Sequence, residues 1–309
     1  MARARMRRLT VVGALVTALA ASLALATPAA ATPVRAAASV IAAGAAGASS
    51  ARAKYPPFDP GEIISDDSFF NPDAMTAAQI QRFLEQRRCV PVGGAPCLAQ
   101  YRASTPHVPA SPERCAAIDG MTGERASSIV ARIAKACTIS PRVLLVLLQK
   151  EQSLLTAPSP SGYQKATGYA CPDTAACDRK YFGFFNQVYR AAWQFREYTV
   201  HPADWRYRIG PNRIQFHPDA ACGSTRVTIA DQATANLYNY TPYQPNAETL
   251  ASPKGPGGVC STFGNLNFSR LYTDWFGSPL AVRFPGLQQP CVVYTGGFGC
   301  GQLRPLTTH

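Results

Sequence analysis

The sequence predicts a mainly α-helical fold with a small β-hairpin and loops that are closed by disulfide bonds. Three observations predict it. Apolar residues recur at helical spacing behind helix-capping residues, only one stretch alternates as a hairpin does, and all ten cysteines follow residue 88. The chain has 309 residues, of which 47% are hydrophobic and 16% charged. This composition is typical of globular proteins and excludes a disordered or collagen-like chain.

The N-terminus has the form of an export signal. Four arginines in the first eight residues precede an uncharged apolar run from Leu9 to Ala26, and Ala29-Ala30-Ala31 offers a cleavage site. The run is near the length of a membrane anchor, but the small-residue site favours cleavage. We therefore expect residues 1–31 to be a signal peptide, with no stable membrane anchor after cleavage and a location outside the cell or in its wall. Residues 32–54 are Ala-rich and predict a flexible spacer.

The charge of the chain lies mainly in its N-terminal segments. The formal net charge is +12, but residues 55–309 hold 23 basic and 18 acidic residues, a net charge of +5. A modest positive charge suits an anionic polymer such as a cell wall. The basic residues are not clustered as in nucleic-acid-binding proteins, so we expect no nucleic-acid partner.

The cysteines predict disulfide bonds, because an even number in an exported chain indicates a disulfide framework. The sequence has no C-x-x-C motif and no pair of histidines at a metal-binding spacing, so we expect no metal site. A catalytic cysteine would leave an unpaired partner. The connectivity stays open, and pairing between sequence neighbours is the simplest prediction: Cys89–Cys97, Cys115–Cys137, Cys171–Cys177, Cys222–Cys260 and Cys291–Cys300.

An N-terminal helical extension is predicted over residues 55–122. The segment Thr76–Gln79 has the pattern of a capping box, which begins a helix that continues to about Arg88. The segment Cys89–Pro112 is predicted to be a loop. A second helix is expected from about Gly123 to Ala136, because its apolar residues lie at helical spacing.

The next segment predicts a buried helix. Ser140 is a suitable N-cap and Pro141 suits the first helical position. Val143–Leu148 are six consecutive apolar residues, and a helix that is apolar on every side is buried. Glu151 follows in the last part of this helix.

Further elements follow in the second half of the chain, where helical periodicity alternates with Gly- and Pro-rich loops. A hairpin is expected around Gly210-Pro211-Asn212, because the flanking residues alternate weakly between polar and apolar. The others are a loop over 157–181, a helix over 183–198, a helix capped by Asp231 that runs to about Tyr238, a loop over 251–264, a helix over Asn267–Phe276 and a disulfide-looped tail over 279–309.

Glu151 is the sharpest candidate for chemistry. Apolar surroundings and the negative end of the helix dipole both raise the pKa of a carboxyl group. A carboxylic acid that keeps its proton near neutral pH can act as the general acid of glycosidic cleavage. The structural alternative is that Lys150 and Glu151 mark the point where the helix reaches solvent.

Two stretches mix aromatic and amide side chains, YFGFFNQVY at 181–189 and NLYNYTPYQPN at 236–246. Sugar-binding clefts place aromatic faces against pyranose rings and amides against hydroxyl groups. In the alternative interpretation the aromatic side chains fill the core and the amides cap turns.

The order of these motifs resembles that in the lysozyme-like superfamily, in particular lytic transglycosylases and related peptidoglycan hydrolases. LLVLLQKEQSLL is followed by GFFNQ and then by NLYNYTPY. SDDSFFNPDAMTAAQIQRFLEQ also resembles a segment of a group of exported actinobacterial proteins. The resemblance implies a lysozyme-like domain over residues 55–278.

The resemblance also implies roles for particular residues. Glu151 matches the catalytic general acid and base of the family. Asn186 or Gln187 matches the amide that binds substrate, and Tyr240 or Tyr243 matches a tyrosine near the acid.

The sequence departs from the family pattern directly after the acid. Gln152 stands where transglycosylases commonly have serine, and Ser153 comes one residue later. A hydrolase would also use a second acid. Asp173 and Asp178 are the candidates, although a solvated loop explains both.

The implied function is cleavage of peptidoglycan glycan strands by an exported, monomeric enzyme without a cofactor. It would be a hydrolase or, if the muramyl 6-hydroxyl attacks, a transglycosylase. Two alternatives stay open: a non-catalytic wall-binding or adhesion protein on the same fold, and a disulfide-rich envelope protein without glycan affinity.

Overall fold

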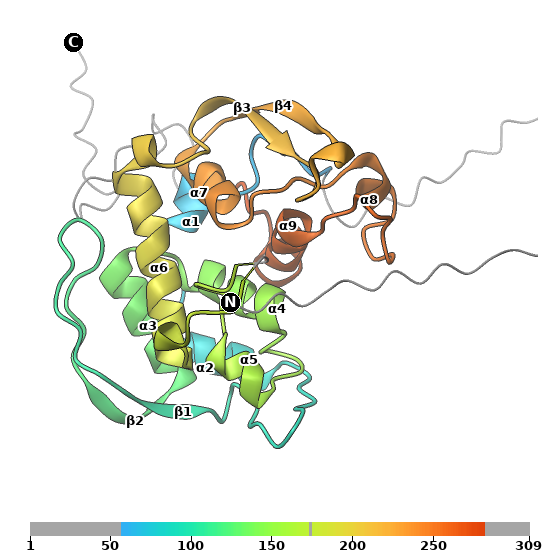
Figure 1. Cartoon of the computed structure of the whole chain (residues 1–309). Helices are drawn as coiled ribbons and strands as arrows, with labels where there is room; N and C mark the ends of the chain where they lie inside the picture. Colours follow the sequence, from blue (N-terminus) through green and yellow to red (C-terminus); the bar gives the residue numbers. More distant parts are fainter. Residues whose placement is uncertain (1–56, 173–174, 282–309) are drawn as a thin grey trace, which may run out of the picture. The chain divides into compact units, whose positions relative to one another are not determined.

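The computed structural model describes residues 57–172 and 175–281, and these ranges form nine α-helices and two antiparallel hairpins (Figure 1). The signal peptide, the spacer and the Cys291–Cys300 pairing fall outside the described residues. The mainly helical fold class is confirmed. The helices are α1 (Asp66–Phe69), α2 (Ala77–Glu85), α3 (Ala126–Cys137), α4 (Pro141–Gln152), α5 (Pro160–Gln164), α6 (Phe184–Val200), α7 (Gln232–Tyr240), α8 (Ala247–Ala251) and α9 (Gly264–Phe276). The strands are β1 (Arg102–Thr105), β2 (Met121–Arg125), β3 (Gly210–Gln215) and β4 (Ser224–Ile229).

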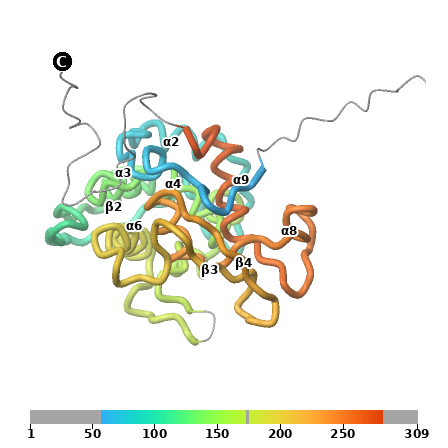
Figure 2. Tube along the Cα trace, turned by 90° about the horizontal axis from the view of Figure 1, so that it is seen from above, coloured from blue at the N-terminus to red at the C-terminus, as the bar shows by residue number. Residues whose placement is uncertain are grey.

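Helix α4 lies in the core, as its apolar run predicts. Val143–Leu148 are all fully buried. Helices α3 and α9 pack against α4, and Figure 2 shows α4 between them. Pro141 occupies the first turn and Ser140 the N-cap position, but the Ser140 hydroxyl makes no capping bond. The backbone N–H of Ser140 instead donates to the carbonyl of Phe69, which attaches the start of α4 to the end of α1.

Two further helices, α2 and α7, begin at the capping residues that the sequence predicts. Thr76 and Gln79 form the reciprocal capping box of α2, with N–O distances of 3.3 and 2.8 Å. The Asp231 carboxylate accepts from the backbone N–H of Thr234 at 2.7 Å and caps α7. Helix α2 ends at Glu85, three residues before the predicted end, and α9 begins three residues before its predicted start.

The sequence analysis missed the first hairpin. Strand β1 lies inside the segment expected to be a loop, and β2 occupies residues expected to begin a helix, so that helix starts at Ala126. Both strands expose most of their residues on both faces, with only Thr105 and Glu124 buried. They therefore lack the apolar alternation that indicates a strand.

The second hairpin exists, but its predicted turn was wrong. Gly210-Pro211-Asn212 begins β3, and residues 216–223 connect β3 to β4. The bend before β3 comes from Gly210, whose φ is 102°, and from the Asn212 amide, which donates to the carbonyls of Arg208 and Gly210. Gly210 and Pro211 thus lie at a bend where β3 begins, and they do not form the turn between the two strands.

Four of the five predicted disulfide pairings are confirmed, and they include every cysteine of the described ranges. Each joins segments that are near in sequence and stabilises the fold by roughly 2–4 kcal/mol. The bonds are Cys89–Cys97, Cys115–Cys137, Cys171–Cys177 and Cys222–Cys260.

Two buried carboxyl groups join α1 to α7. The Asp66 carboxylate is nearly inaccessible and accepts from the backbone N–H of Ala233 at 2.8 Å. Burial raises the pKa of Asp66 to about 7, and the nearby Asp231 carboxylate adds to the rise. Burial also raises the pKa of Asp231 to about 6. Both groups therefore hold their protons more tightly in the folded than in the unfolded chain.

This difference predicts a stability that falls as pH rises. Asp66 favours folding fully below its unfolded pKa near 4, and this contribution is lost as pH rises to about 7. The change is at most about 4 kcal/mol. Between pH 4 and 7, we expect the free energy of unfolding of the wild type to fall relative to that of Asp66→Asn. Urea titrations at several pH values measure this difference. Asp73→Asn, at an exposed ion pair with Lys135, is the control. A constant difference between wild type and Asp66→Asn across this range would contradict the assignment.

Candidate functional site

Glu151 lies in the last turn of α4, where the buried helix reaches the edge of the core. Its side chain is 24% exposed, and α4 ends one residue later, before Ser153 in a left-handed conformation. One carboxylate oxygen, Oε1, lies 2.5 Å from the Nζ atom of Lys150. The other, Oε2, faces the backbone of Gly168. The expected apolar surroundings are thus replaced on one side by an ammonium group.

Gly168 permits a close approach to the carboxylate. A Cβ atom at this position would lie 3.4 Å from Oε2 of Glu151, and the φ of Gly168 is +71°. Side chains with a Cβ rarely adopt this φ. The backbone of the loop after α5 therefore forms one wall beside the acid.

Lys150 connects three elements at the site. Its side chain is only 8% exposed, and its ammonium donates to Oγ1 of Thr241 at 3.0 Å as well as to Glu151. Thr241 follows α7, and the start of α9 at Gly264 lies near the same ammonium. A buried ammonium needs such partners, because removing a charge from water is costly.

Tyr240 contacts the loop that carries Gly168. Its hydroxyl donates to the carbonyl of Thr167 at 2.8 Å, one residue before Gly168. Burial, followed by the Glu151 carboxylate, raises the pKa of Tyr240 well above its usual value. The phenol therefore stays protonated and keeps its hydrogen bond to Thr167. Tyr243 lies next to the hairpin, where its backbone bridges to Gln215 of β3.

The Gln187 amide is committed to hydrogen bonds within the protein, unlike that of Asn186. Its side chain is fully buried and makes five hydrogen bonds. Oε1 accepts from the backbone N–H groups of Thr167 and Tyr169 and from the Thr167 hydroxyl group, at 3.1–3.3 Å. Nε2 donates to the carbonyls of Tyr169 and Tyr181, at 3.0 and 2.9 Å. Because Thr167 and Tyr169 flank Gly168, Gln187 positions the loop that faces the acid.

Asn186 is the amide that a ligand can reach. It lies in the first turn of α6, is exposed, and donates to the carbonyl of Phe182 at 3.1 Å. Of the two candidate second acids, Asp173 lies outside the described residues. Asp178 forms an exposed ion pair with Lys180 and caps a short 3₁₀ helix, as expected of a solvated loop.

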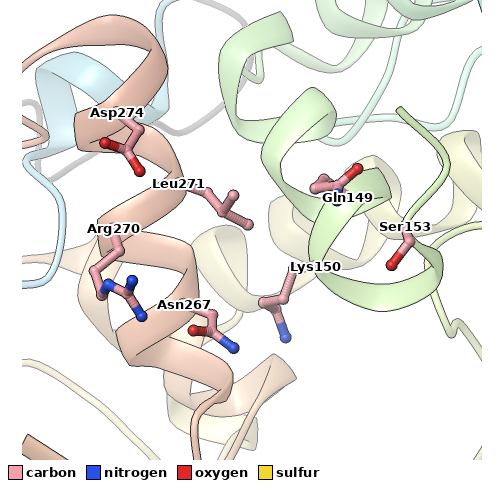
Figure 3. A pocket seen from close by; sticks show the side chains of 7 residues that line it. All are labelled: Gln149, Lys150, Ser153, Asn267, Arg270, Leu271 and Asp274. Carbon is pink, nitrogen blue, oxygen red and sulfur yellow. The ribbon is translucent and has the colours of Figure 1, made fainter. Parts of the chain in front are cut away.

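A polar pocket of about 300 Å³ opens between α4 and α9 beside Lys150 (Figure 3). Figure 3 shows the Lys150 ammonium and the Asn267 amide on facing helices. Amides and hydroxyls of this kind can form hydrogen bonds with sugar hydroxyls. The lining residues are Gln149, Lys150, Ser153, Asn267, Arg270, Leu271 and Asp274.

Three residues of this site were missed by the sequence analysis: Lys150, Gly168 and Thr241. Lys150 was considered only as a sign that the helix reaches solvent, and Gly168 lies in the loop expected over 157–181. Thr241 lies inside the stretch NLYNYTPYQPN at 236–246, where only the aromatic and amide side chains were considered as ligands.

The family model described as "LasA, N-terminal domain" matches residues 62–289, which include all nine described helices and both hairpins. The chain belongs to this family. No curated protein and no solved structure is similar enough to the chain to count as a match. For this LasA N-terminal domain protein, the resemblance to lysozyme-like enzymes stays a prediction.

Within residues 57–172 and 175–281, no three His, Cys, Asp or Glu side chains are grouped so that they could hold a metal ion. In the same ranges, none of the helices is long and apolar enough to span a membrane.

Proposed function

We propose that this LasA N-terminal domain protein is an exported enzyme that cleaves the glycan strand of peptidoglycan, with Glu151 as general acid and base. One observation carries the proposal: a partly exposed carboxylate at the end of a buried helix is held between a glycine backbone and an ammonium, near a buried phenol that its charge affects. The four disulfide bonds support export, because such bonds persist in oxidising compartments.

Glu151 must carry a proton when it meets the glycosidic oxygen. A bound sugar excludes water, and a low-polarity environment favours a neutral pair over an ion pair. Glu151 passes its proton to the leaving oxygen as the glycosidic bond breaks.

The resulting carboxylate completes the reaction. It stabilises the oxocarbenium-like state and then accepts a proton from the attacking hydroxyl, which belongs to the muramyl 6-position in a transglycosylase and to water in a hydrolase. Asn186 would bind an N-acetyl group or hydroxyl, as the resemblance to lysozyme-like enzymes implies. Tyr240 and Gln187 position the loop that carries Gly168 against the acid.

A second candidate function is non-catalytic binding of the cell wall. The Lys150–Glu151 ion pair favours it, because a permanently paired carboxylate is a poor proton donor. Incubation of the purified protein with sacculi separates the two functions. The enzyme is expected to release soluble muropeptides, whereas a binding protein would sediment with the sacculi and release nothing.

Gly168→Ala tests whether the loop backbone must lie against the acid. A Cβ atom there lies at ordinary contact distance from Oε2 of Glu151, but the loop beside the acid must relax from a φ of +71°, so we expect muropeptide release to fall by about tenfold. Gly94→Ala is a matched control: its φ is +75°, and a Cβ atom there meets nothing within 4 Å. Each change should cost roughly 1 kcal/mol of stability through its backbone conformation. Equal activity of the two variants would contradict a role for this wall.

A further inference from the structure

Exposed arginines collect on the hairpin β3–β4 and on the segment before it. Residues 205–230 contain four arginines and one acidic residue, Asp219. The carboxylate of Asp219 accepts from the backbone N–H of Ala221 in the connecting turn. All four arginines are exposed: Arg206, Arg208, Arg213 and Arg226. The hairpin therefore presents a local excess of positive charge that the nearly balanced composition of residues 55–309 does not indicate.

Three of these side chains line one hollow. Arg206, Arg208 and Arg213 border a space of about 590 Å³ whose lining contains no acidic residue. Arg226 lies directly opposite Arg213 in the register of the two strands. Like charges at such positions repel one another, and a bound anion would relieve this repulsion.

The backbone that carries these arginines is held rigidly. The Asn239 side chain bonds to both the N–H and the carbonyl of Tyr207, at 3.0 and 2.9 Å. The Asn212 side chain bonds in the same way to the N–H and carbonyl of Arg208. Tyr207 is buried, and its hydroxyl donates to the carbonyl of Pro242. A fixed backbone lowers the entropic cost of binding a ligand.

We propose that this face binds an anionic polymer of the cell envelope through Arg206, Arg208 and Arg213. Guanidinium groups bind phosphate and carboxylate in the same planar, two-point geometry, so the ligand carries one of these anions along a flexible chain. The inference goes beyond the proposed function, because it involves no cleavage and none of the residues around Glu151.

The hairpin is nevertheless connected to the candidate active site. Residues 240–243 pass from Tyr240 and Thr241, beside Glu151, to Pro242 and Tyr243, which contact Tyr207 and β3. An anionic polymer that is bound at the hairpin would therefore hold the protein against the wall while the glycan strand occupies the other site.

The test compares two triple variants of the full chain that have the same net charge. The first is Arg206→Gln, Arg208→Gln and Arg213→Gln on the hairpin. The second, Arg82→Gln, Arg88→Gln and Arg125→Gln, changes exposed arginines elsewhere. Arg125 faces Arg102 across the first hairpin, so the control also removes one member of a cross-strand arginine pair.

Binding is measured by isothermal titration with three probes: poly(glycerol phosphate), polygalacturonate and single-stranded DNA. We expect the wild type and the control variant to bind one of the first two probes, and the hairpin variant to bind it at least about tenfold more weakly. The stronger of these probes identifies the anion as phosphate or carboxylate. Binding should weaken with added salt.

Three outcomes would overturn the proposal. In the first, the wild type would bind neither polymer at low salt. In the second, the two triple variants would lose affinity equally, and this equality would show an effect of net charge alone. In the third, DNA would bind as tightly as the polymers and depend on the same arginines, which would make nucleic acid the ligand.

Discussion

Glu151→Gln is expected to reduce muropeptide release from sacculi by about 100-fold or more. The amide has the shape of the carboxyl group but cannot transfer the proton, and general acid–base catalysis contributes about 10²–10⁴-fold. The measurement is the initial rate of release by the wild type and the variant at equal concentration. Glu85→Gln, which removes an exposed carboxylate from α2, should keep the wild-type rate.

The folding of this variant needs its own control, because Lys150 would lose its charged partner in a largely buried position. The double variant Lys150→Met with Glu151→Gln removes both charges and should restore thermal stability without restoring release. If Glu151→Gln is folded and releases muropeptides at the wild-type rate, Glu151 is not the general acid.

Gln187→Leu is expected to lower the free energy of unfolding by roughly 3–5 kcal/mol. Leucine fills a similar volume but leaves the backbone groups of Thr167, Tyr169 and Tyr181 buried without their hydrogen bonds, each at a cost of about 1–3 kcal/mol. Urea denaturation of the purified variant measures the change. The loop that carries Gly168 would also lose its attachment to α6, so muropeptide release should fall with stability.

The neighbouring residue supplies the control for this prediction. Asn186→Ala removes one exposed hydrogen bond from the same helix turn, and its effect on stability should stay within about 0.5 kcal/mol. Similar destabilisation by both substitutions would show that the buried amide network is not what holds the loop.

The helices could be predicted because local signals agree with burial. Thr76 and Asp231 cap their helices through bonds within three residues, and the apolar run Val143–Leu148 is long enough to indicate a buried helix. Such signals depend on neighbouring residues alone. The first hairpin had no such signal, since its strands are polar on both faces.

The candidate site could be predicted only in part. Consecutive residues on a helix do not normally face each other, so the contact between Lys150 and Glu151 could not be predicted from their spacing. It forms at the last turn of α4, where Thr241 from a distant segment holds the ammonium. Asn186 and Gln187 are similarly adjacent and chemically alike. Only the packing of Tyr169 and Tyr181 against α6 makes one exposed and the other buried.

The most direct test of the account is mass spectrometry of the soluble products after purified sacculi are treated with wild type or Glu151→Gln. The account predicts muropeptides with newly formed glycan ends from the wild type and none above background from the variant. Anhydro-muramyl ends would identify a transglycosylase, and reducing ends would identify a hydrolase. Absence of release by a wild type that still binds sacculi would contradict the enzyme and leave the wall-binding function. Equal release by the two proteins would contradict the role of Glu151.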